Sequence, residues 1–199
     1  MPIKPLLLLC TLALTPATGQ LMERYRSSLG QHREFRAPFT QLRYLRMFDH
    51  PLESGGTLTF SHPDAIKLHY TRPFAASIVY EDGKVSRYRE ENGALVRQPS
   101  MDIVTRAITR EMVRWLSADF GADFPYRASL VDGDSLHLEL RPTNPAAAAL
   151  FSSIELYLTE EKNYITRVKL IEESGDSIVI IHHTPDFGPI DRSEFRAPQ

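Results

Sequence analysis

The sequence predicts a mainly β protein built on one antiparallel sheet of about eleven strands that curls on itself. Between residues 35 and 98, and again between 126 and 183, apolar residues alternate with polar ones in short runs, the pattern of half-buried strands. Turn dipeptides such as Asp82-Gly83 and Asn92-Gly93 separate these runs. Helical periodicity is confined to three segments, too few to cover so wide a sheet. The sheet must therefore curl and enclose either a packed barrel or a cavity.

Residues 1–19 are predicted to be a signal peptide, and residues 20–199 the domain that follows it. Lys4 precedes an apolar run over residues 6–14, and small residues lead to a cleavage point near Gly19. The alternative, a membrane anchor, is disfavoured because the run is too short to span about 30 Å of hydrocarbon. We therefore expect an exported protein.

The position of Cys10 disfavours lipid attachment to the chain itself. A lipoprotein signal ends its apolar run with a small residue directly before the cysteine, whereas Leu9 precedes Cys10 in the middle of the run. Cys10 is also the single cysteine in the sequence. Cleavage near Gly19 would thus leave no disulfide, no thiol nucleophile and no cysteine-ligated metal.

Composition excludes one class of partner. Of the 199 residues, 42% are hydrophobic and 24% charged, as in an ordinary soluble domain, and the formal net charge is −2. A nucleic-acid-binding domain would carry a basic surface instead. We expect no nucleic-acid partner.

The three helical segments have different patterns. Residues 20–31 place apolar side chains every four residues, and Asn144-Pro145 is a helix start that opens a short third helix. Residues 100–118 are amphipathic, with an apolar stripe on one face. That stripe consists of Val104, Ile108, Met112 and Trp115. Another face carries Arg106, Arg110 and Arg114, which either contact lipid headgroups or an acidic partner, or form a solvated face.

No catalytic or metal-binding pattern stands out. The sequence has no Gly-x-Ser-x-Gly elbow, no Gly-rich phosphate loop and no His-Glu-x-x-His helix. His182 and His183 are adjacent on a predicted strand, so they point to opposite faces and cannot chelate one metal together. We expect no enzyme activity, no metal and no cofactor.

Six short motifs lie one after another along the predicted strands and at the C-terminal end. The set comprises Phe39-Thr40-Gln41, Gly56-Thr57-Leu58-Thr59-Phe60 with His62-Pro63, Lys67-Leu68-His69-Tyr70 with Pro73, Ser77-Ile78-Val79-Tyr80, Asp82-Gly83-Lys84 with Tyr88, and Ile190-Asp191-Arg192-Ser193-Glu194-Phe195 with Pro198. In this order the motifs resemble the outer-membrane lipoprotein carrier family, LolA. The resemblance spans the chain after residue 19.

The resemblance implies an unclosed antiparallel half-barrel whose helices form a lid over a hydrophobic cavity. It implies a monomeric periplasmic shuttle that takes acylated lipoproteins from an inner-membrane ABC transporter to an acceptor at the outer membrane. Two alternatives remain: a carrier of a different lipid or hydrophobic metabolite, and a periplasmic domain that senses lipid.

The cavity would have to shield acyl chains from water. One buried CH₂ is worth about 0.8 kcal/mol, so an exposed sixteen-carbon chain costs on the order of 12 kcal/mol. Ordinary core packing is the alternative role for every apolar residue of the wall and the lid. The candidates for the wall are Phe39, Leu58, Phe60, Leu68, Tyr70 and Ile78, and those for the lid helix are Val104, Ile108, Met112 and Trp115.

Two departures from the family pattern indicate a divergent branch. The family has an arginine that hydrogen-bonds the lid where this chain has His62. A histidine there is expected either to contact the lid, with a dependence on pH, or to be a surface turn residue. The family also has a tryptophan after its Asp-Gly turn, where this chain continues with Val85.

Overall fold

The computed structural model describes residues 16–99, 103–119, 126–131, 135–142, 145–159 and 164–196. Most of the predicted signal peptide, residues 1–15, lies outside these ranges. The elements are α1 (Pro16–Gln31), β1 (Glu34–Tyr44), β2 (Leu52–Ser61), β3 (Ala65–Arg72), β4 (Ala76–Glu81), β5 (Lys84–Glu91), β6 (Ala94–Arg97), α2 (Ile103–Leu116), β7 (Tyr126–Val131), β8 (Ser135–Leu140), α3 (Pro145–Ala148), β9 (Phe151–Thr159), β10 (Tyr164–Glu172), β11 (Ser177–His182), β12 (Asp186–Phe187) and the 3₁₀ turn η1 (Arg192–Phe195).

The strands form one antiparallel sheet that does not close. Its order is β6-β5-β4-β3-β2-β1-β11-β10-β9-β8-β7, and the short β12 pairs with β1 beside this path. Strands from the two ends of the chain meet at the centre, where Phe39 of β1 lies opposite His182 of β11. Within the described residues, β6 and β7 each have one partner strand and remain the two edges. The predicted open half-barrel of about eleven strands is therefore confirmed.

Two hairpins show why the meander has such short connections. Asp82 and Gly83 have φ values of 49° and 78°, and Asn92 and Gly93 have φ values of 53° and 81°. Positive φ at both central residues is the type I′ geometry that matches the twist of the flanking strands. Glycine adopts it without strain and Asn or Asp tolerates it, so these dipeptides fix β4–β5 and β5–β6 as tight hairpins.

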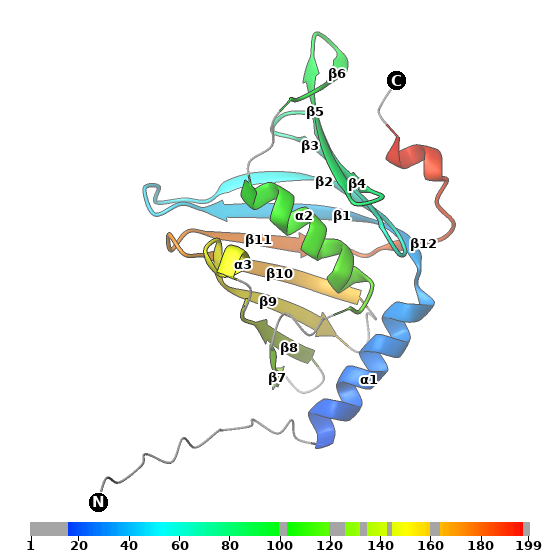
Figure 1. Ribbon diagram of the computed structural model, residues 1–199, viewed down its shortest axis with the longest axis vertical. Coiled ribbons are helices and arrows are strands. Elements are labelled where there is room, and N and C mark those ends of the chain that lie inside the picture. The colour runs from blue at the N-terminus through cyan, green and yellow to red at the C-terminus, as the bar shows by residue number, and fades with distance from the viewer. Residues whose placement is uncertain are drawn as a thin grey trace, which may run out of the picture.

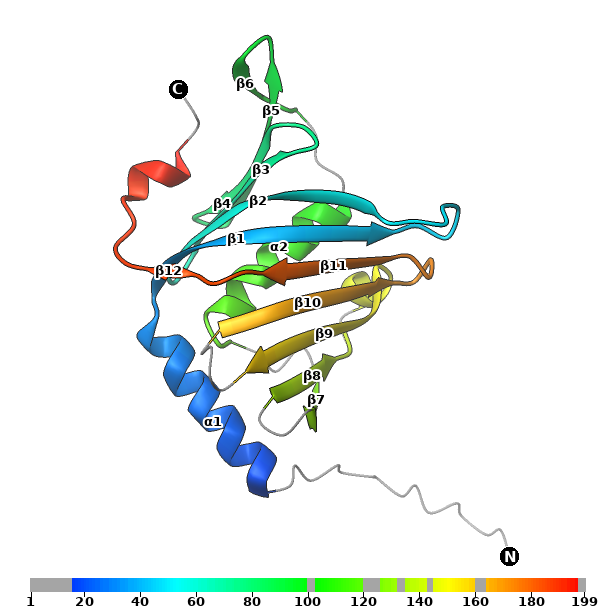
Figure 2. The same cartoon turned by 180° about the vertical axis from the view of Figure 1, so that it is seen from behind.

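The helices lie on one side of the sheet and at one end of it. Figure 1 shows α2 crossing the concave face with α3 near it, and Figure 2 shows the sheet from behind with α2 beyond the strands. α1 lies at the lower end, where it contacts β7, β8 and β10. It begins at Pro16, earlier than the predicted start at residue 20, and proline is well accepted in the first turn because no backbone N–H is needed there.

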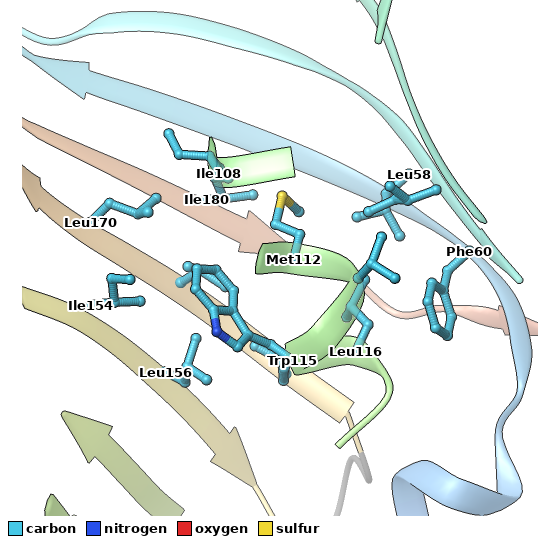
Figure 3. Packing of buried hydrophobic residues seen from close by; sticks show 14 of the residues in the cluster. Leu58, Phe60, Ile108, Met112, Trp115, Leu116, Ile154, Leu156, Leu170 and Ile180 are labelled. Carbon is cyan, nitrogen blue, oxygen red and sulfur yellow. The ribbon is translucent and has the colours of Figure 1, made fainter. Parts of the chain in front are cut away.

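The core lies between α2 and the concave face. Figure 3 shows Met112, Trp115 and Leu116 of α2 packed toward side chains from both halves of the sheet. Those partners include Leu58, Phe60, Ile154, Leu156, Leu170 and Ile180, all buried. The apolar stripe predicted on residues 100–118 thus faces the sheet. Through it, α2 packs against both halves of the sheet.

Candidate functional site

A cavity of about 990 Å³ lies at the end of the concave face where α2 begins. Its floor is apolar and comes from three strands and the helix. The floor residues are Leu68, Ile78, Ile108, Ile178 and Ile180. The hairpins that join β1 to β2 and β3 to β4 end at this side of the sheet, as Figure 1 shows. The cavity is open to solvent there.

The predicted wall and lid residues divide into two groups. Leu68, Tyr70, Ile78 and Ile108 line the cavity. Five others are at most 2% exposed and belong to the packed core farther along the trough, the space between α2 and the concave face of the sheet: Phe39, Leu58, Phe60, Met112 and Trp115. The side chain of Val104 lies outside the described part of the chain. With α2 in this position the cavity occupies one end of the trough, and the helix fills the rest.

Sequence reasoning missed the residues that continue the wall toward solvent. Gln41 and Arg43 on β1 share the face of Phe39 because alternate residues of a strand point the same way. Ile178 and Ile180 supply the opposite side from β11, and Thr105 and Thr109 come from α2. The alternation along β1 would have placed Gln41 and Arg43 on the inner face. Because both side chains are polar, a search for an apolar wall does not select them.

A hydrogen bond joins the apolar floor to the polar rim. The hydroxyl of Tyr70 donates to Gln41 Oε1 at 3.0 Å, and the Tyr70 ring packs edge-on against Phe39 with 5.1 Å between centroids. Burial of the phenol raises the pKa of Tyr70 to about 12, so the hydroxyl stays a neutral donor. Tyr70 therefore marks the change from apolar to polar lining.

His62 contacts the segment just beyond the C-terminal end of α2. His62 Nδ1 lies 3.3 Å from Ser117 Oγ, just beyond α2, and the turn that carries it is part of a second cavity of about 830 Å³ beside the helix. Burial, with the positive charge of Arg33, lowers the pKa of His62 despite the opposing charge of Asp64. The hydrogen-bonding partner of His62 is thus the Ser117 hydroxyl. That His62 locks the lid stays a prediction.

The arginines predicted on the other face of α2 have different surroundings. Arg114 forms ion pairs with Asp119 at 3.3 Å and Glu111 at 3.6 Å. Arg106 and Arg110 are exposed, and Arg110 lies 3.9 Å from Glu111. For Arg110 and Arg114, these acidic neighbours from the same helix region favour local charge neutralisation over a lipid contact.

Two further features concern metals and membranes. The described residues contain no group of three histidine, cysteine, aspartate or glutamate side chains arranged to hold a metal ion. Among the helices described, none combines the length and hydropathy that crossing a bilayer requires.

The geometry can be compared with known proteins. The family model for "outer membrane lipoprotein carrier protein LolA" matches residues 31–197, from the end of α1 through η1. The chain belongs to the LolA family. Its resemblance to that family, predicted from the order of the motifs, is confirmed, and the family is one of lipoprotein carriers rather than enzymes. A comparison with the sequences of curated proteins found no match.

Two solved structures with TM-scores above 0.5 show the same fold at low identity, and a third is similar over almost its whole length. An uncharacterized conserved protein from Thermus thermophilus has 13% identity and a TM-score of 0.53, over 92% of this chain and 95% of that one. A DUF1329 family protein from Desulfovibrio piger has 8% identity and a TM-score of 0.52, over 92% and 98%. A LolA superfamily protein from Nitrosomonas europaea has 11% identity and a TM-score of 0.48, over 93% and 99%.

Proposed function

We propose that this protein carries lipid acyl chains in the cavity beneath the start of α2. The observation that supports this most directly is the apolar floor between sheet and helix, within a fold of the lipoprotein carrier family. Binding is by burial of apolar surface, which needs no chemical step and can be reversed by moving the helix. The protein is a carrier and not an enzyme.

The proposed route follows from family membership and the N-terminal segment. Residues 1–19 direct export and are removed near Gly19. The mature protein then receives acylated lipoproteins from an inner-membrane ABC transporter in the periplasm and passes them to an acceptor at the outer membrane. It works as a monomer.

A larger cargo needs more room than the open cavity provides. The five predicted residues in the packed core (Phe39, Leu58, Phe60, Met112 and Trp115) lie directly beyond its floor. Displacement of α2 would extend the apolar trough along these residues without altering the sheet. We therefore assign Leu68, Tyr70, Ile78 and Ile108 to first contact, and the packed residues to later stages of loading.

The proposal can be tested by a substitution that fills the cavity with a large side chain. Ala76 on β4 lines the cavity, and Ala94 on β6 is exposed and lies outside the lining. Native mass spectrometry of the protein purified from its own periplasm should show bound lipid. The Ala76→Trp variant should carry at least tenfold less, while Ala94→Trp should match the parent. An empty parent protein that also fails to take up a fluorescent fatty acid would refute the carrier function.

A further inference from the structure

The polarity of the trough changes in one direction along its length. On the inner face of β1 the side chains run from Phe39 to Gln41 to Arg43, and on β3 from Leu68 to Tyr70. Arg72 then ends β3 at the open side of the cavity. An amphiphile in this trough would therefore place its tail toward α2 and its head toward the arginines.

The open side of the cavity is strongly basic. Its lining contains four arginines, Arg43, Arg72, Arg87 and Arg89, and one carboxylate, Glu90. Three of the arginines pair with carboxylates outside the lining. Arg43 donates one hydrogen bond to Glu172 at 3.4 Å, Arg89 donates one to Glu91 at 3.5 Å, and Arg72 lies 4.0 Å from Glu53. Long, partly exposed pairs of this kind contribute little and leave donors available.

Two of these arginines have N–H groups without partners. The Nε atom of Arg43 is buried and makes no hydrogen bond, which is costly for a polar donor. The guanidinium of Arg87 has no hydrogen bond and no ion pair within the described part of the chain. Arg87 acts on the Tyr70 hydroxyl through its charge, and that hydroxyl is bonded to Gln41, two residues before Arg43 on β1. The two arginines thus flank one polar rim.

We propose that the basic rim binds the phosphate of an anionic phospholipid, whose acyl chains lie on the apolar floor. The planar guanidinium fork matches two phosphate oxygens, and such charge-assisted bonds would give the Arg87 side chain a hydrogen-bond partner, while Arg43 adds its positive charge to the same rim. The inference rests on the proposed acyl-chain binding in this cavity and adds to acylated lipoproteins a second class of ligand, a lipid that carries a phosphate group. The same chemistry would also be recognised in free phosphate, so the test must separate the two sources.

The experiment compares three ligands by calorimetric titration of the purified chain. Dihexanoyl phosphatidylglycerol and dihexanoylglycerol have the same acyl chains and differ in the phosphate head, and inorganic phosphate has the head without the chains. The phospholipid should bind at least about tenfold more tightly than the neutral lipid, since hydrogen bonds to charged groups are the strong ones. Inorganic phosphate should bind more weakly than the phospholipid.

Arginine variants test whether the preference for the phospholipid over the neutral lipid comes from the basic rim. Arg87→Gln removes a side chain that pairs with nothing in the described structure, so folding is preserved, and it should reduce the preference about tenfold. Arg43→Gln should act in the same direction. The matched control is Arg141→Gln, because Arg141 is exposed and pairs with Glu139 away from the cavity. It should bind all three ligands as the parent does.

The possible failures are distinguishable. Equal binding of the two lipids by the parent and by Arg87→Gln would overturn the headgroup site and leave the carrier function intact. Failure of both lipids to bind would overturn the carrier function itself. Inorganic phosphate binding as tightly as phosphatidylglycerol would also overturn the inference, by showing a free-anion site to which acyl chains add nothing.

Discussion

His182 is a buried base in the middle of the sheet. Its side chain is 5% exposed, and Nδ1 donates to the carbonyl of Ile165 at 2.8 Å, which assigns the ring proton to Nδ1. The Nε2 atom is buried without a hydrogen-bond partner. Burial lowers the pKa of His182 to about 4; the bond to Ile165 opposes this and the charge of His183 adds to it. The folded state therefore holds His182 neutral.

This neutral histidine should make stability depend on pH. Because the unfolded chain binds a proton near pH 6.5 and the folded chain only near pH 4, the unfolded state holds more protons between these values. The stabilisation is present above pH 6.5 and is lost as the pH falls. Urea unfolding at pH 7 and pH 5 should show His182 contributing about 2 kcal/mol of the difference.

Two variants separate this effect from other titrations. His182→Leu should be less stable at pH 7, because the Ile165 carbonyl loses its donor, but its free energy of unfolding should depend less on pH. The neighbouring His183 is exposed, so His183→Gln should retain the parent's pH dependence. An unchanged pH dependence in His182→Leu would show that His182 does not titrate as described.

The sequence predicts that these two side chains point in opposite directions, but it does not predict which of them is buried. Adjacent residues of a strand point to opposite faces, and His182 and His183 are predicted to do so. In the structure His182 is the last residue of β11 and is buried, whereas His183 directly after it is exposed. Which face is buried could not be predicted, because Ile178 and Ile180 on one face are as apolar as Val179 and Ile181 on the other. Only the pairing of β11 with β1 and β10 decides it.

Among the elements, α2 is the one whose movement the proposed loading requires. Trp115 is its largest buried side chain, 1% exposed, and is the single tryptophan of the sequence. It lies toward Ile154 and Leu156, in the section that must open for a large cargo (Figure 3). Its fluorescence therefore reports the position of the helix.

We predict that binding of a long-chain lipid changes the emission of Trp115. If α2 moves off Leu58 and Phe60, the indole leaves its packed site, and its emission should shift and become more accessible to a soluble quencher. The Trp115→Phe variant should lose the signal while still binding lipid, which assigns the signal to this residue. Tight binding with unchanged emission would show that α2 is a fixed part of the core rather than a lid.

The sequence predicts that α2 exists, but it does not predict whether the helix is permanently packed on the sheet or can move off it. Helical spacing of Ile108, Met112 and Trp115 predicted a helix over 100–118, and the structure has it over Ile103–Leu116. The same apolar stripe suits permanent packing and a removable lid equally well, because both bury the same side chains. The cavity described above lies at the start of α2, where the strands β3 to β5 continue past the helix.

On the scale of the whole molecule, the two halves of the sheet are covered differently. Strands β3 to β5 curve away from the rest, and the C-terminal segment packs against their outer face (Figure 2). Ile190 and Phe195 contact Ala65, Val79 and Tyr88 there, forming a second core. Polar contacts add to it: Arg36 pairs with Glu194, Lys67 Nζ donates to the Glu194 carbonyl at 3.1 Å, and Arg192 pairs with Asp64 at 3.0 Å.

The second core should stabilise strands β3 to β5, which supply a large part of the cavity lining. Phe195 is 2% exposed, so Phe195→Ala should lower the free energy of unfolding by about 3 kcal/mol or more, through lost burial and the void left behind. Phe74 is 78% exposed, and Phe74→Ala should change stability by less than about 0.5 kcal/mol. Because Phe195 touches one half alone, hydrogen exchange in Phe195→Ala should accelerate in β3 to β5 while β8 to β10 stay protected. Equal acceleration of hydrogen exchange in β3 to β5 and in β8 to β10 would mean that the sheet unfolds as one unit. In that case the cavity could widen only by movement of α2.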